Sequence, residues 1–273
     1  MYADILTQQK NYTGRIVLLL ESMDESSPFA DNFCDPRVSP TFCTHLPGET
    51  GDVTILGVVH GHPASVGRVE TVLERRSPAT LALELPAGAI PLYRTYAEEI
   101  DETGRPRYGD EMSAAIAAAP DAAVVGIDAP AWSFLRRLVT RLVGGRVTPT
   151  TARRVLSSFG RVTRTSLSCR VAASVSDAPA TIVAPDDPVE YGVEATDPPD
   201  RQAAHECAHL AGVRALDRCA GDSVRHRDDL REACMIDRLR ALRHRGDVVA
   251  VVGVGHLDAI AAGLDVDADP RRS

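Results

Sequence analysis

Four polar residues follow short apolar runs of the kind that form buried β-strands. His60 and His256 each end a Gly-x-x-His motif, while Glu84 and Asp128 each lie at the end of a run rich in Val, Leu, Ile and Ala. Ligands of open α/β sheets bind beyond the carboxyl ends of the strands, so parallel strands would bring these side chains to one edge. Imidazole and carboxylate ligands suit Zn, Mn, Fe or Co, and they can also hold a water molecule or a substrate.

Each of the four residues also has an ordinary structural explanation. A histidine just after a strand can bond to nearby backbone, and Asp128 can cap the helix that follows it. Glu84 is the most informative, because an ionised carboxylate in an apolar run must be paired, bound to a ligand or at the open end of its strand. The sequence therefore predicts a strand-end site and leaves its chemistry open.

A second candidate centre is the string His205-Glu206-Cys207-Ala208-His209, which matches the HExxH pattern of zinc proteases. On a helix the two histidines share one face and can bind zinc, with the glutamate as general base. A third ligand is needed, and Glu232 lies downstream on another expected helix. The alternative is a surface or lid helix whose histidines are solvated.

The elements that would position these residues alternate between strand and helix. Strands are expected at 53–59, 80–85, 122–127 and 248–252, and helices at 64–76, 111–119, 132–143, 150–175, 201–219, 224–245 and 257–264. The first strand, helix and second strand make a βαβ unit of about 30 residues, which predicts a parallel pair. The expected fold class is α/β, with a mainly parallel central sheet flanked by helices.

The chain of 273 residues is expected to hold one main domain. That α/β domain spans 51–265 and carries a helical insertion at about 130–245, before the last strand. Residues 1–50 are expected to be an irregular lead-in, and 266–273 a polar tail. The proline-rich stretch 176–200 is expected to be a long loop.

Composition narrows the partners and the compartment. There are 30 Lys and Arg against 38 Asp and Glu, giving a net charge of −8, which argues against a nucleic-acid partner. The apolar runs fall short of the ~20 residues of a transmembrane segment, and the N-terminus does not read as a signal peptide. Six cysteines without a CxxC pair suit reduced thiols, so a cytoplasmic location is expected.

Several short motifs occur in a fixed order along residues 53–264. They are Gly57-Val58-Val59-His60, Leu83-Glu84-Leu85, Gly109-Asp110-Glu111-Met112, Gly126-Ile127-Asp128 with Leu135-Arg136-Arg137 after it, Arg231 on the helix before the last strand, and Gly253-Val254-Gly255-His256. This order resembles the TraB/PrgY family. That family is related to the Tiki proteases and, more remotely, to erythromycin-esterase-like and ChaN-like proteins.

The resemblance implies a metal-dependent hydrolase, of peptidase type, using Mn, Co or Zn. His60 and His256 would then be metal ligands, with Glu84 as third ligand or as general base for a metal-bound water. Arg231 or Arg136 would hold a substrate carboxylate or a developing oxyanion. The candidate catalytic residues are Glu84, Asp128, Arg231, Arg136 and Glu111.

Two other functions stay open at this point. A peptide-binding regulator without turnover, of the pheromone-shutdown type, would leave the same residues in place. A zinc protease built on His205 and His209 is the further alternative. The expected partner in each case is a peptide or small-molecule substrate, and a homo-oligomer also stays open.

Overall fold

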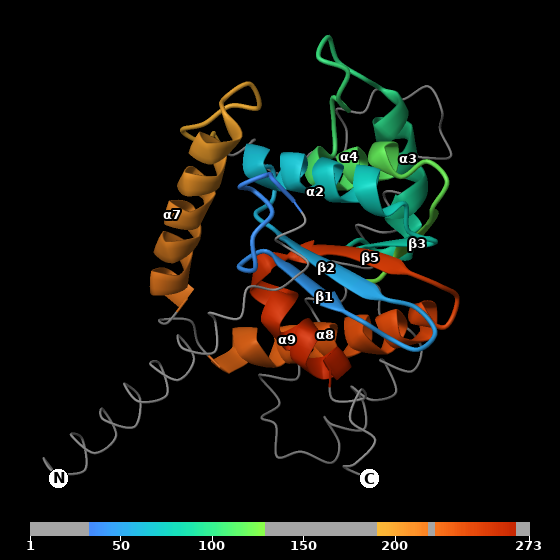
Figure 1. Cartoon of the computed structure of the whole chain (residues 1–273). Helices are drawn as coiled ribbons and strands as arrows, with labels where there is room; N and C mark the ends of the chain where they lie inside the picture. Colours follow the sequence, from blue (N-terminus) through green and yellow to red (C-terminus); the bar gives the residue numbers. More distant parts are fainter. Residues whose placement is uncertain (1–32, 129–189, 218–221, 266–273) are drawn as a thin grey trace, which may run out of the picture.

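A mixed five-stranded sheet forms the centre of the part of the chain that the computed structural model describes, residues 33–128, 190–217 and 222–265. The strand order is β1-β2-β5-β3-β4 (Figure 1). The strands are β1 (Cys43–Leu46), β2 (Val53–Val58), β3 (Thr80–Leu83), β4 (Ala123–Gly126) and β5 (Val248–Gly253). β1 runs antiparallel to β2, and the other neighbours pair in parallel.

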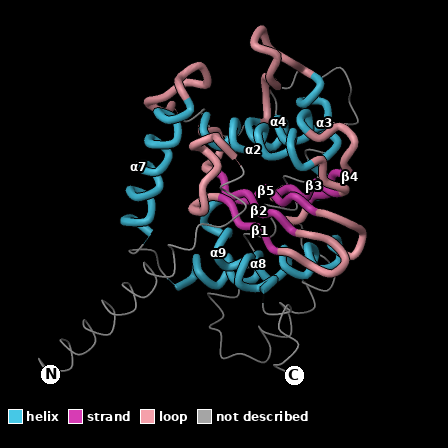
Figure 2. The backbone as a smooth tube through the Cα atoms, in the orientation of Figure 1, coloured by secondary structure: helices cyan, strands magenta, loops and turns pink. Residues whose placement is uncertain are grey.

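Helices cover both faces of this sheet (Figure 2). One face carries α2 (Pro63–Arg76), α3 (Ile90–Glu98) and α4 (Asp110–Ala118), and the other carries α8 (Asp222–Arg243) and α9 (Val254–Asp265). A buried apolar cluster lies on each side, one built around Val69, Leu73 and Ala115, the other around Met235, Leu239 and Leu257. The remaining helix, α7 (Pro199–Asp217), stands beside the sheet and contacts α2.

The expected α/β class with a mainly parallel sheet is confirmed. β1 lies in the stretch that we expected to be irregular. It was not predicted because its residues are mostly half-exposed and show no clear apolar alternation. α3 was not expected either, although Pro91 in its first turn is a common helix start. The expected strands and helices lie within a few residues of the observed ones, except 132–143 and 150–175, which lie outside the described residues.

The helices that follow the neighbouring strands β2 and β5 cover opposite faces of the sheet. β2 and β5 pair in parallel with Val58 opposite Gly253, yet the helix after β2 packs in one apolar cluster and the helix after β5 in the other. Such a topological switch point opens a crevice beyond the strand ends, where α/β proteins bind ligands. The residues that follow β2, β3 and β5 are therefore the first place to look for a site.

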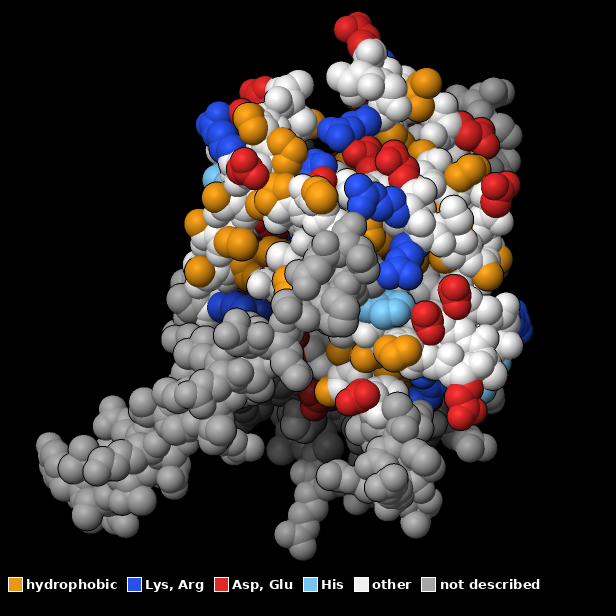
Figure 3. Space-filling model, in the orientation of Figure 1, with side chains coloured by type: hydrophobic (Ala, Val, Ile, Leu, Met, Phe, Trp, Pro, Cys, Tyr) orange, Lys and Arg blue, Asp and Glu red, His pale blue; other side chains and the backbone are white. Residues whose placement is uncertain are grey.

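The surface shows mixed charge on the face in Figure 3, where acidic and basic side chains are interspersed. Hydrophobic side chains gather over α7 on that face, and α7 exposes Val213. Within the described ranges, no helix combines the length and the apolar character that crossing a membrane requires.

Candidate functional site

Three of the residues predicted at strand ends surround Gly253, the last residue of β5. A β-carbon on Gly253 would lie 3.4 Å from Glu84 Oε2, 3.5 Å from His60 Nε2 and 3.8 Å from His256 Cδ2. We call the space next to the Gly253 α-carbon the Gly253 notch. A methyl group at this position would already contact all three side chains, so glycine leaves their polar atoms uncovered on this side of β5.

A buried carboxylate orients His60. Glu111, in the first turn of α4, is 2% exposed and accepts a hydrogen bond from His60 Nδ1 at 2.7 Å. Its second oxygen accepts from the Gly61 backbone N–H at 3.0 Å. The hydrogen bond to Glu111 raises the pKa of His60 above its ordinary value. With Nδ1 donating, the neutral imidazole has a free lone pair on Nε2, the atom that faces the notch, and 62% of its side chain is exposed.

Arg231, on α8, joins the two strand-end carboxylates. Its Nη2 donates to Glu84 Oε1 at 2.5 Å and its Nε donates to Asp128 Oδ1 at 2.8 Å. Burial opposes the charge of Arg231, but its bonds to Asp128 and Glu84 raise the pKa of the guanidinium overall. Burial raises the pKa of Asp128, and Arg231 partly offsets this. The Gly253 N–H donates to Glu84 Oε2 at 2.6 Å, so both oxygens of Glu84 have partners.

His256 has a carboxylate partner that sequence reasoning placed elsewhere. Glu232 on α8 accepts from His256 Nδ1 at 2.8 Å, with both side chains mostly buried. The apolar stripe of α8 contains the signal, since stepping back three and four residues from buried Met235 leads to 232 and 231 on the sheet-facing side. Each Gly-x-x-His histidine is thus held through Nδ1 by a glutamate from a helix.

These residues do not form a metal site as they lie. In the described part of the chain, no group of three or more His, Cys, Asp or Glu side chains is arranged to hold a metal ion. His256 turns its carbon Cδ2 towards the notch, and its Nε2 lies 3.4 Å from Arg231 Nη1. A guanidinium therefore lies against two of the three side chains that a metal would need.

The glutamate of the HExxH string has a structural role. Glu206 and Arg68 are both fully buried and form an ion pair, with Arg68 Nη2 donating to Glu206 Oε2 at 2.5 Å. The Ser65 hydroxyl donates to the other oxygen of Glu206. This carboxylate is enclosed between α7 and α2 and cannot act as a base on an outside water. The third ligand considered for this string, Glu232, is bonded to His256 instead.

The histidines of that string pack around His62, which caps the N-terminus of α2. The Ala64 N–H donates to His62 Nδ1 at 3.1 Å, so neutral His62 carries its proton on Nε2, 3.0 Å from His205 Nδ1. A protonated Nε2 cannot bind a metal. The rings of Tyr191 and His209 also lie against His62. Burial, followed by the nearby His205 and His209, lowers the pKa of His62 to about 4.

Lowering the pH from about 6.5 to about 4 is expected to destabilise the fold through His62. The pKa of His62 is lower in the folded than in the unfolded chain. The unfolded chain therefore binds more protons in this window, and a contribution present above pH 6.5 is lost as the pH falls. His62→Asn keeps a capping acceptor and should lose roughly 2–3 kcal/mol less than wild type between the two pH values. Urea unfolding at both pH values measures this difference.

The exposed His244 provides the control, because His244→Asn should keep the wild-type pH dependence. Equal losses in wild type and His62→Asn would contradict the assignment.

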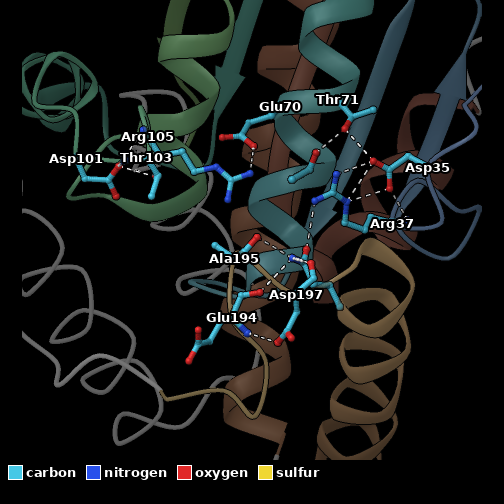
Figure 4. Close-up of polar contacts among 12 residues, drawn as sticks. Asp35, Arg37, Glu70, Thr71, Asp101, Thr103, Arg105, Glu194, Ala195 and Asp197 are labelled. Atoms are coloured by element: carbon cyan, nitrogen blue, oxygen red, sulfur yellow. Dashed lines mark hydrogen bonds and ion pairs between the residues drawn. The ribbon is translucent and has the colours of Figure 1, made fainter.

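A polar network fixes the start of α7 and the loop before it (Figure 4). Buried Gln202 donates to the backbone carbonyls of Glu194, Ala195 and Asp197, and it accepts from Arg37 Nη1 at 3.2 Å. The same loop carries Tyr191, whose hydroxyl donates to the His60 backbone carbonyl at 2.7 Å. This contact, which sequence reasoning missed, links the α7 region to the strand-end site.

The structure thus brings together five of the predicted site residues, His60, Glu84, Asp128, Arg231 and His256, and places Glu111 directly behind His60. Arg136 lies outside the described residues. Comparison of the chain with models of protein families, with curated proteins and with solved structures finds no match. The candidate site rests on its geometry.

Proposed function

We propose that this protein is a hydrolase of amide or ester bonds in which His60 acts as general base. The observation that supports this most is the His60–Glu111 pair. A buried carboxylate holds Nδ1 at 2.7 Å, and the free Nε2 faces an open notch at a topological switch point. Peptides are the substrate class that the resemblance to the TraB/PrgY family implies, and they are the first class to test.

The proposed reaction begins with a water molecule in the Gly253 notch. His60 Nε2 takes a proton from it while the water oxygen bonds to the substrate's carbonyl carbon and the carbonyl electron pair moves onto oxygen. The tetrahedral intermediate then collapses, the C–N or C–O bond breaks, and His60 returns the proton to the leaving group. Glu111 stabilises the imidazolium that exists between the two transfers.

Glu84 is the second group at the notch. Its Oε2 lies about as close as His60 Nε2 to the position of the missing Gly253 β-carbon. We therefore place one water between these two atoms, farther from the α-carbon than that position. Arg231 and the Gly253 N–H hold this carboxylate in place. Because Arg231 already pairs with Glu84 and Asp128, we assign it to positioning these carboxylates rather than to binding a substrate anion.

Glu111→Gln is expected to move the acidic limb of the pH profile of kcat/KM to lower pH. The base must be neutral to act, and wild-type Glu111 raises the pKa of His60, so removing the negative charge lets His60 lose its proton at lower pH. The plateau should fall by at least about tenfold, because the imidazolium loses its charged partner. Hydrolysis of p-nitrophenyl acetate and of a defined peptide pool, followed from pH 5 to 9, measures both effects.

Glu232→Gln is the matched control, since it alters the equivalent partner of His256. It should leave the acidic limb in place. A shift in Glu232→Gln and none in Glu111→Gln would make His256 the base. If wild type binds peptides from the pool but hydrolyses neither probe, the hydrolase proposal is wrong and peptide binding without turnover takes its place.

A further inference from the structure

Arg231 contacts two of the three strand-end side chains that a metal ion would need, Glu84 and His256. Its Nη2 is 2.5 Å from Glu84 Oε1, and its Nη1 is 3.4 Å from His256 Nε2. A third nitrogen, Nε, donates to Asp128. The guanidinium is thus in contact with a carboxylate and an imidazole nitrogen that the sequence assigned to a metal centre.

The contacts of His256 and Glu84 are those of residues already bound to a cation. His256 donates from Nδ1 to Glu232 at 2.8 Å, which leaves the Nε2 lone pair directed at Arg231. Metal-bound histidines use the same arrangement, with the outer nitrogen donating to a carboxylate. A divalent ion brought to these atoms would meet a fixed positive charge within a few ångströms, in a partly buried setting where charges interact strongly.

We propose that Arg231 is the resident cation of this centre and prevents a divalent metal from binding at His60, Glu84 and His256. Loss of its guanidinium opens a latent metal site made of those three side chains. This inference does not depend on whether the protein is a hydrolase, because it concerns only which cation, the Arg231 guanidinium or a metal ion, the strand-end carboxylates bind.

Titration with Co²⁺ alone tests the proposal, read by the visible absorption of the bound ion and by calorimetry. Wild type should bind no stoichiometric Co²⁺ at these residues. Arg231→Met, which keeps the length of the side chain without its charge, should bind one equivalent at least about 100-fold more tightly. The triple variant Arg231→Met/His60→Ala/His256→Ala should lose that binding. Circular dichroism confirms folding in each case.

Thermal melting gives a second readout if Arg231→Met is unstable. Removing Arg231 leaves Glu84 and Asp128, which are 6% and 15% exposed, without their cation. Co²⁺ should then raise the Tm of Arg231→Met and leave that of wild type and the triple variant unchanged. The Co²⁺ titration of the wild-type protein can be carried out even if Arg231→Met does not fold. One equivalent of Co²⁺ in wild type that His60→Ala/His256→Ala removes would overturn the proposal, as would a folded Arg231→Met without increased affinity.

Discussion

Replacing Glu206 with alanine is expected to lower the free energy of unfolding by about 3–5 kcal/mol, among the largest effects of any single substitution in this chain. Arg68 and Glu206 are both 0% exposed, so the variant would leave an uncompensated charge in the interior. Arg68 cannot turn outwards easily, because its guanidinium lies over the Phe42 ring at 4.2 Å from the centroid. Urea unfolding at pH 7 measures the change.

Two comparisons separate the loss of this ion pair from a general sensitivity of the α2–α7 contact. Glu70→Ala removes a carboxylate of α2, the helix that carries Arg68, from a partly exposed pair with Arg105 and should cost at most about 1 kcal/mol. Arg68→Met/Glu206→Leu replaces both charges with apolar groups and should recover most of the lost stability. If Glu206→Ala unfolded like wild type but abolished hydrolysis, Glu206 would be a catalytic group and the HExxH string would need a new interpretation.

The centre of the sheet could be predicted because its strands are buried on both faces. β2 and β5 are continuous apolar runs, and every residue of β2 and all but the last of β5 are buried. β1 could not be predicted in the same way, because it is short and three of its four residues are only partly buried, which leaves a weaker pattern. Local patterns therefore define β2 and β5 well and β1 poorly, while β4, the other edge strand, is still marked by an apolar run.

The location of the candidate site could be predicted from the sequence, but most of its side-chain contacts could not. The strand-end rule brought His60, Glu84 and His256 together from three separate motifs. Their partners join segments far apart in the chain, such as Arg231 with Glu84, 147 residues away. Such pairings depend on how helices pack on the sheet, and no local pattern encodes that packing.

The HExxH string shows a second limit of local sequence patterns. Its spacing does place His205 and His209 against one ring, that of His62. The spacing contains no information about Glu206, which lies between the two histidines in sequence but points into the contact between α7 and α2. The buried partners of Glu206 could be predicted only in part. Ser65 and Arg68 follow the same helical spacing as the apolar residues of α2, which places them on its buried face.

His60→Gln is expected to reduce kcat/KM by about 10²–10⁴-fold, the usual contribution of a general base. The glutamine amide can still donate to Glu111, which is buried and would otherwise lose a partner, so the fold should be kept. The imidazole side chain is 62% exposed and contributes little to the core. Initial rates with p-nitrophenyl acetate and the peptide pool, together with Tm by circular dichroism, separate a loss of chemistry from a loss of structure.

His244→Gln is the control for this substitution, because His244 is exposed and bonds to Thr50. Thr50 precedes β2, whereas His60 follows it, so His244 lies at the opposite end of that strand. It should hydrolyse both probes at the wild-type rate. His256→Gln should retain more activity than His60→Gln, since its ring turns a carbon towards the notch while His60 directs Nε2 there. A His60→Gln variant that is folded and as active as wild type would show that the base is another group. Glu84, the other side chain with an oxygen at the notch, would then be the first to test.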